Sequence, residues 1–365
     1  MRKGLLGWLG GCALLAAGSA WSWQFKVGDP TVPIDAAGRR EVVHALGQAM
    51  RNAYVFPAVG KRVAQALDER NAHGAYDHDR TVKAFGDALG EDVRKLADDR
   101  HLRVDFYPDF GKGAGPAEMP SADVRGQWIA RHGYGIDRVE RLPGNVGLLR
   151  VDAFPDADLM ADAYGSAMRL LSGTDALIID LRQNGGGSPE AVAYLMSYFF
   201  DVDDRRELFD VYNHDDGKTQ QYWSFPVSGP RYTRPVYVLV SARTMSAGES
   251  FAYFMQGQKR STVVGDVTWG GANPVRPVKL GHGLVAAVPF MRAFDPQTGK
   301  NWEHVGVKPD VPTDPAQAEH VAYLTLLKAL LPKARDDEDR QAVKSALAAA
   351  EKGTPTPPDY SRLPE

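Results

Sequence analysis

Five short apolar runs, several of them separated by helical stretches, constrain the fold of this chain more than any other feature. The runs span residues 146–151, 176–181, 236–240, 262–264 and 284–288. The helical stretches lie at 157–172, 189–200 and 247–257. Apolar runs of this length indicate buried strands, and strands that alternate with helices are typical of an α/β core.

The N-terminal part has a different pattern. Residues 38–98 repeat apolar side chains at helical spacing, which predicts three helices packed as a small bundle. Residues 101–106 then alternate apolar and polar side chains, as a strand does. We expect one face of this strand to carry Leu102, Val104 and Phe106, and the other to carry His101, Arg103 and Asp105.

These patterns divide the 365 residues into five parts. We expect a leader at 1–20, an N-terminal helical domain that ends in a strand at 21–110, and a linker with a connecting segment at 111–140. An α/β domain at 141–335 and a charged helix with a Pro-rich tail at 336–365 complete the chain. The net charge of −3 lacks the excess of basic residues expected of a nucleic-acid-binding protein.

The first 20 residues predict a signal peptide. Arg2 and Lys3 precede an apolar run at 4–17, and small residues follow it. A membrane anchor is the alternative, but the run is shorter than the roughly 20 residues that a span needs. A lipoprotein anchor at Cys12 is disfavoured because the apolar run continues past it. We expect export to the periplasm or beyond, with no stable membrane insertion and, since Cys12 is the only cysteine, no thiol in the mature chain.

A glycine-rich turn, Gly185-Gly186-Gly187, follows the run at 176–181. Ser188 and Pro189 after it suit the first turn of a helix. Glycines let the backbone approach a ligand and direct N–H groups at an anion, either a phosphate or an oxyanion. The spacing fits neither a Walker loop nor a dinucleotide loop. A tight turn without a function is the alternative interpretation.

Ser246 lies at a second turn from strand to helix. A helix N-terminus supplies free N–H groups and a dipole that favours negative charge, which suits a nucleophile. Ala247 and Gly248 are small enough to leave room for a substrate. The alternative is structural, because Ser246 and Glu249 have the spacing of a capping box. This segment alone favours the cap.

A serine nucleophile needs a base, and the base needs an orienting partner. The loop at 302–310 places Glu303 beside His304, which alone indicates no more than an exposed ion pair. His101, His282 and His304 are rival candidates for the base among the nine histidines. The residues by themselves do not choose among the three.

Six segments, in this order, resemble the C-terminal processing (tail-specific) serine peptidase family. The similarity is greatest to its branch with interphotoreceptor retinoid-binding protein and the tricorn core, and it covers nearly the whole chain after the leader. The segments are DDRHL from Asp98, LPGNVGLL from Leu142, DALIIDLRQNGGG from Asp175, TMSAGESFAY from Thr244, VVGDVTWGGANP from Val263 and FDPQTGKNWEHVGVKPDV from Phe294.

The resemblance implies a crotonase-like β-β-α superhelix beside the helical N-terminal domain, and hydrolysis of a peptide or unfolded protein without metal or cofactor. By motif, Ser246 matches the nucleophile, His101 the general base and Glu303 the acid that completes the relay. The oxyanion hole would then use N–H groups of Ala247 and of Gly185 or Gly186.

Two positions depart from the family patterns. Enzymes with a Ser–Lys dyad have the lysine 25 residues after the serine, where this chain has Gly271. The histidine relay must therefore carry the chemistry. The tricorn pattern has a serine directly before the histidine, where this chain has Arg100. The chain also has too few residues between Tyr107 and Asn145 for a PDZ domain.

A second hypothesis is a non-catalytic binding protein for apolar ligands or peptides, since the retinoid-binding relatives have this fold. Retention of nucleophile, base and acid together distinguishes the two. A binding module needs none of the three, and this chain has all of them at the matching positions.

Overall fold

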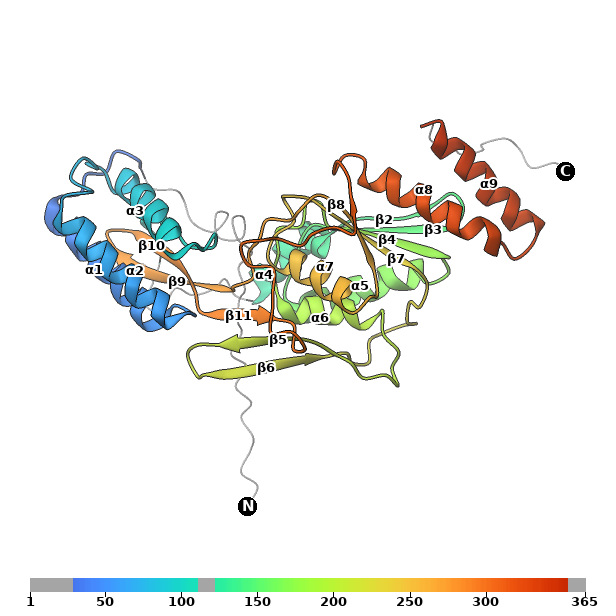
Figure 1. The fold of residues 1–365 in the computed structure, drawn as a ribbon, viewed down its shortest axis with the longest axis horizontal. Helices are drawn as coiled ribbons and strands as arrows, with labels where there is room; N and C mark the ends of the chain where they lie inside the picture. Colours follow the sequence, from blue (N-terminus) through green and yellow to red (C-terminus); the bar gives the residue numbers. More distant parts are fainter. Residues whose placement is uncertain (1–28, 111–121, 354–365) are drawn as a thin grey trace, which may run out of the picture.

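Four of the five predicted strands lie in a six-stranded sheet in the computed structural model, which describes residues 29–110 and 122–353 (Figure 1). The sheet has the order β12-β8-β7-β4-β3-β2, and only β2 runs antiparallel to its neighbour. Its strands are β2 (Ile136–Leu142), β3 (Val146–Val151), β4 (Ala176–Asp180), β7 (Val236–Val240), β8 (Thr262–Gly265) and β12 (Val311–Pro312). The expected leader, Cys12 and the Pro-rich tail from 354 lie outside the described residues.

Alternate residues of the parallel strands enter two different hydrophobic cores. In β4, Leu177 and Ile179 face one core, while Ala176 and Ile178 face the other. This is why β4 is a continuous apolar run rather than an alternating one. The first core is covered by α5 (Ala157–Leu171), α6 (Pro189–Ser197) and α7 (Ala247–Gly257), and the second by α8 (Ala318–Leu330) and α9 (Asp337–Glu351).

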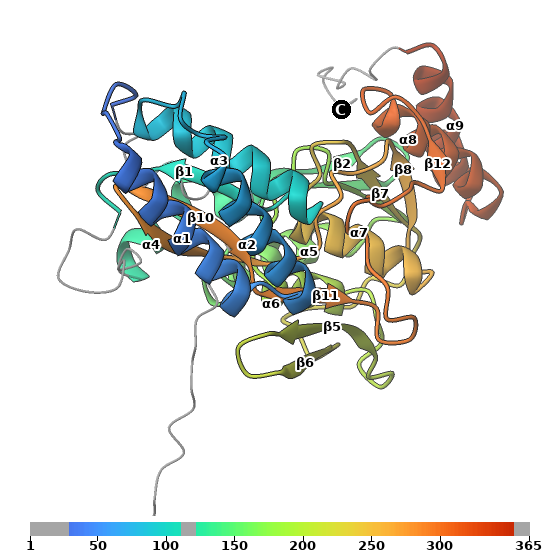
Figure 2. The same ribbon diagram turned by 60° about the vertical axis from the view of Figure 1, so that its left-hand side comes forward.

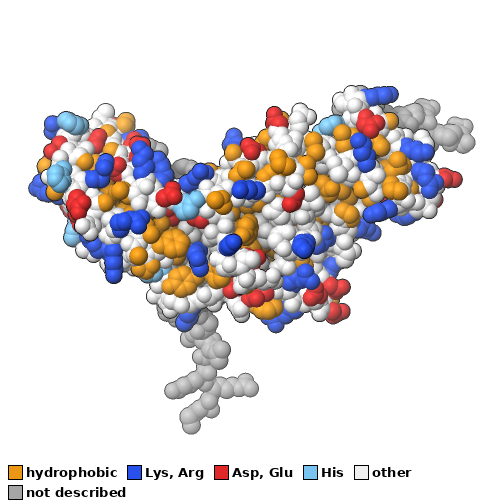
Figure 3. All heavy atoms as spheres, in the orientation of Figure 1, with side chains coloured by type: hydrophobic (Ala, Val, Ile, Leu, Met, Phe, Trp, Pro, Cys, Tyr) orange, Lys and Arg blue, Asp and Glu red, His pale blue; other side chains and the backbone are white. Residues whose placement is uncertain are grey.

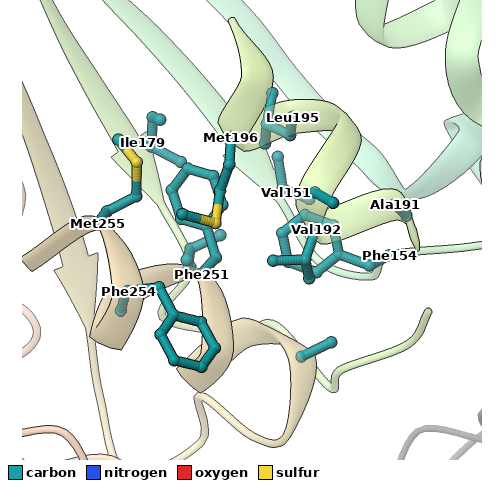
Figure 4. Close-up of a cluster of buried hydrophobic side chains, with 14 of the residues drawn as sticks. Val151, Phe154, Ile179, Ala191, Val192, Leu195, Met196, Phe251, Phe254 and Met255 are labelled. Carbon is teal, nitrogen blue, oxygen red and sulfur yellow. The ribbon is translucent and has the colours of Figure 1, made fainter. Parts of the chain in front are cut away.

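Aromatic and sulfur-containing side chains fill the first core. Figure 4 shows Phe251 and Met255 of α7 on the side of Met196 of α6 and Ile179 of β4. The rings of Phe154 and Phe251 stack with centroids 6.0 Å apart. The helix that begins after Ser246 is thereby held firmly against the sheet.

The N-terminal unit consists of three helices on a small sheet (Figure 2). The helices are α1 (Ala36–Ala53), α2 (Pro57–Ala72) and α3 (Val82–Ala97), and the sheet has the order β1-β10-β9. β1 (Arg103–Phe106) comes from the N-terminal part, whereas β9 (Val275–Gly281) and β10 (Leu284–Pro289) come from far along the chain. As predicted, Leu102, Val104 and Phe106 are buried on the core side of β1.

One segment differs from the predicted division of the chain. Residues 275–289, which we placed in the α/β domain, pair with β1 and pack on the N-terminal helices. The N-terminal unit is therefore closed by a hairpin that belongs, in sequence, to the second half of the chain. The remaining boundaries of the domain division stay a prediction.

A third sheet lies below the central sheet in the view of Figure 1. It has the order β11-β5-β6, with β5 (Glu207–Asn213), β6 (Lys218–Trp223) and β11 (Met291–Phe294). The sequence pattern did not predict it, nor α4 (Ala122–Arg131), β2 and α8.

Figure 3 shows acidic and basic side chains interspersed on one face of the molecule. Among the helices within 29–110 and 122–353, none combines the length and apolar character needed to cross a membrane.

Leu284 should be essential for attaching the returning hairpin to the N-terminal helices. It is 1% exposed, and a Cβ added at Gly86 of α3 would lie 2.6 Å from its Cδ2 atom. We expect Leu284→Ala to lower the free energy of unfolding by about 2–5 kcal/mol, because the cavity cannot close fully. Urea unfolding followed by circular dichroism measures this. Val305→Ala, at a position that is 57% exposed, is the control and should change stability by less than about 0.5 kcal/mol.

Candidate active site

Ser246 occupies a strained turn between β7 and α7. Its backbone has φ 50° and ψ −115°, a conformation that side chains other than glycine rarely adopt. Its N–H donates to Glu249 Oε2 at 2.8 Å, so this half of the predicted capping box is formed. Unlike Glu249, which is fully buried, Ser246 is partly exposed at the start of the helix.

The Glu249 carboxylate binds two segments of the chain together. Besides Ser246 N–H, it accepts hydrogen bonds from the Thr268 hydroxyl (2.5 Å), Gly270 N–H (2.6 Å) and Gly271 N–H (3.0 Å). Burial raises the pKa of Glu249 to about 7, and these four hydrogen bonds oppose that rise. The loop at 268–271 is thus fixed beside the backbone of Ser246.

The glycine turn lies against Ser246. A Cβ added at Gly186 would lie 2.9 Å from Ser246 Cβ, so only glycine allows this approach. Asn184 is fully buried; its backbone carbonyl accepts from Met245 N–H, and its side-chain Nδ2 donates to Val151 O. Asn184 therefore holds the glycine turn and the serine turn in register.

The predicted oxyanion donors differ in whether their N–H groups already have hydrogen-bond acceptors. Gly185 N–H donates to Asp152 O at 3.0 Å, and Gly186 N–H donates to Asn184 Oδ1 at 2.9 Å. Ala247 is the first residue of α7, so its N–H has no acceptor within the helix. Of the three, Ala247 N–H is therefore the one without an acceptor among the described residues.

His101 lies just before β1 and is only 2% exposed. Asp99 fixes its backbone, since Asp99 Oδ1 accepts from His101 N–H at 2.9 Å. The same carboxylate accepts from the Tyr54 hydroxyl at 2.9 Å and lies 3.8 Å from His101 Nδ1. Burial lowers the pKa of His101 to about 4 despite the nearby Asp99 charge, so the imidazole is neutral at ordinary pH.

The His101 ring occupies the space beside Gly271. A Cβ at Gly271 would lie 2.3 Å from His101 Cε1, and the Trp269 ring meets the imidazole edge-on with centroids 4.9 Å apart. A lysine at position 271 would collide with this histidine. The histidine thus fills the space that a lysine side chain at position 271 would need, so the chain can have one or the other at this point but not both.

Glu303 reaches the same cluster from the loop after β11. Its Oε2 accepts from Ala272 N–H at 2.5 Å, and Asp99, His101 and Glu303 each offer an atom within 4.8 Å of the others. Burial, and then the charge of Asp99, raises the pKa of Glu303. Neither ring nitrogen of His101 has a hydrogen-bond partner among the described residues, so no direct bond joins it to Ser246 or Glu303.

The rival histidines lie elsewhere. His282 is exposed and pairs with Glu41 at 3.3 Å, and His304 is exposed and lies 3.7 Å from Asp98.

Arg100, which stands where the tricorn pattern has a serine, donates to the Trp269 carbonyl. It therefore helps to hold the loop that packs on His101.

Sequence reasoning missed several residues that shape the site. Asp99 stood within the DDRHL segment, and Glu249 was considered only as a cap. Asn184 stood within the DALIIDLRQNGGG segment, directly before the glycines. Nothing in the pattern at Trp269 indicated a ring against the histidine.

Residues 145–313 match the model described as peptidase family S41. The carboxyl-terminal-processing protease of Synechocystis sp. is 30% identical over 203 residues, which cover 51% of this chain and 44% of that protein. The tricorn protease of Thermoplasma volcanium is 27% identical over 175 residues, covering 47% and 15%. The chain thus spans less than half the length of these curated relatives.

The crystal structure of mature CPAF superimposes with a TM-score of 0.56 and 12% identity, covering 80% of this chain and 98% of that one. This likeness concerns the fold, a mixed α/β architecture with N-terminal helices. The resemblance inferred from the sequence segments is thus confirmed over residues 145–313, where this chain is similar to peptidase family S41.

Proposed function

We propose that this chain is a serine peptidase in which Ser246 is the nucleophile, His101 the general base and Glu303 the acid of the relay. One observation carries the proposal. A single oxygen, Glu249 Oε2, accepts hydrogen bonds from both Ser246 N–H and Gly271 N–H, and Gly271 touches the His101 ring. The nucleophile and the base are thereby kept in one neighbourhood by a buried carboxylate.

In the proposed reaction the Ser246 hydroxyl attacks the carbonyl carbon of a peptide bond. His101 accepts the hydroxyl proton and returns it to the leaving amine. Because the imidazole is buried and neutral, one ring nitrogen has a lone pair that can accept the proton, and the lowered pKa makes it a weaker base than an ordinary histidine. Glu303 Oε1, which has no hydrogen-bond partner among the described residues, would in the ionised form accept from the other ring nitrogen. A small shift of the ring upon substrate binding is required to form both bonds.

The oxyanion would be bound by Ala247 N–H and by one N–H of the glycine turn. Gly185 or Gly186 can serve only by exchanging its present acceptor for the substrate oxygen. A donor of this kind contributes about 3–4 kcal/mol to the lowering of the barrier. The positions of the turn and of the α7 N-terminus, side by side, support this assignment.

The finer points of the function rest on the family and on the sequence. The core would be of the crotonase-like type, and the substrate a peptide or an unfolded protein. The leader pattern at 1–20 supports export, so the cell envelope is the expected place of action. A binding-only protein is the rival function, and the next experiment distinguishes the two.

Labelling with a fluorophosphonate tests the nucleophile. We expect the purified chain to be labelled, and Ser246→Ala and His101→Ala to lose the label, because an unactivated serine hydroxyl reacts poorly. Gel fluorescence measures the label, and circular dichroism checks that each variant is folded. An unlabelled parent chain, beside a labelled peptidase of the same family, would favour the binding-only function.

The pH dependence of labelling tests the base. An ordinary histidine, with its pKa near 6.5, would lose its basic form as the pH falls through that value. Burial lowers the pKa of His101 to about 4, so we expect the labelling rate to persist below pH 6.5 and to fall only near 4. Stopped reactions at a series of pH values give the midpoint. A midpoint at 6.5 would point to an exposed histidine as the base.

Glu249→Gln tests the shared carboxylate. The amide cannot accept all four hydrogen bonds, and each buried donor left without a partner costs about 1–3 kcal/mol. We expect lower stability and slower labelling together. Glu190→Gln is the matched control, since Glu190 also lies in the first turn of a helix but accepts from the Ser188 and Tyr222 hydroxyls, which can rotate. Equal effects in the two variants would contradict a special role for Glu249.

A further inference from the structure

Unpartnered polar atoms gather around His101. Four of the seven buried side-chain nitrogen and oxygen atoms that have no hydrogen-bond partner among the described residues lie in this cluster. They are both ring nitrogens of His101, Oε1 of Glu303 and Oδ1 of Asn273. Asn273 lies next to Asp99, to which its amide donates at 3.4 Å.

When Glu303 is ionised, as it would be on binding a cation, acceptors outnumber donors among these atoms. A neutral imidazole supplies one acceptor and one donor, whereas the carboxylate and the amide oxygen only accept. The Asn273 amide nitrogen donates to Asp99, and its buried oxygen has no donor among the described residues. Buried acceptors without donors are costly, and a cation is one species that can satisfy several of them at once.

The three ligand-type residues stand close enough to share an ion. Asp99, His101 and Glu303 each offer one atom within 4.8 Å of the others, and Asp99 Oδ1 lies 3.8 Å from His101 Nδ1. Asp99 is 1% and His101 2% exposed. Asp99 is anchored by Tyr54, so one ligand is already fixed in place.

We propose that Asp99, His101 and Glu303 form a binding site for a divalent transition-metal ion, with Zn²⁺ as the best fit, and that the bound ion inhibits the chain. One imidazole nitrogen with two carboxylate oxygens is a ligand set that Zn²⁺ accepts, with a fourth position left for water. Mg²⁺ and Ca²⁺ prefer sites made of oxygen alone. The inhibitory part rests on the proposed function, because the ion would occupy the nitrogen that the base needs, whereas the binding part does not.

Binding is tested first, in the full chain with Ser246→Ala so that no catalysis interferes. Co²⁺ added to metal-free protein should give a visible absorption band that saturates at one ion per chain, and Zn²⁺ should abolish it. We expect His101→Ala to remove the band and Glu303→Gln, the conservative variant, to weaken binding roughly tenfold or more. Mg²⁺ should not compete.

The matched control is His282→Asn, which removes another histidine that is paired with a carboxylate but lies on the surface. We expect it to bind Co²⁺ as the parent does. Circular dichroism identifies any variant that fails to fold, and Glu303→Gln keeps the test valid if His101→Ala does. Absence of stoichiometric binding, or binding that survives both His101→Ala and Glu303→Gln, would overturn the proposal.

Inhibition is tested on the chain with Ser246 intact. Zn²⁺ should slow fluorophosphonate labelling reversibly, with recovery on adding a chelator. If labelling is absent at all metal concentrations while Co²⁺ binding depends on His101, the peptidase function fails and the metal site stands. If labelling is normal and unaffected by Zn²⁺, the inhibitory site fails and the peptidase function stands.

Discussion

The buried carboxylate of Glu249 is the constraint on which the candidate site depends. It is taken out of water with four donors around it, and those donors come from the serine turn and from the loop at 268–271. Through Thr268, whose hydroxyl also accepts from Val307 N–H, the network extends toward the loop that carries Glu303. The cap and the nucleophile are therefore compatible interpretations of one turn, since Glu249 binds the backbone N–H of Ser246 rather than its hydroxyl.

The base reaches this turn from a unit made of two distant parts of the chain. β1, which follows His101, pairs with β10, and β10 comes shortly after the loop that Glu249 holds. The β1–β10 pairing therefore brings His101 close to the loop at 268–271, whose Trp269 and Gly271 pack on the imidazole. Gly271 is the point where they touch, and the lack of a side chain there admits the imidazole. A histidine and a lysine could not both fit at this point.

The local sequence pattern predicted most strands of the central sheet and the helix α7 beside it, because β3, β7 and α7 are regular and largely buried along their length. β3, β7 and α7 agree with their predicted bounds. The run at 284–288 predicted strand β10 of the hairpin β9–β10. Its pairing with β1 could not be predicted, because that pairing depends on contacts between segments far apart in the sequence. β5 and β6 escaped notice since β6 is mostly exposed and carries no apolar run. The hydrogen bond of Gly185 N–H could not be predicted either, because its acceptor, Asp152 O, lies on another segment of the chain.

The number of lone pairs already in use distinguishes the two carboxylates beside His101. Asp99 accepts from Tyr54, from Asn273 and from the backbone of His101, so it is mainly occupied in holding the histidine in place. Glu303 accepts only from Ala272 through Oε2, and its Oε1 has no partner among the described residues. A charged imidazole formed during catalysis would need a new acceptor for its second N–H. Glu303 has that capacity to spare, which is a physical reason to assign it the orienting role although Asp99 lies nearer in sequence.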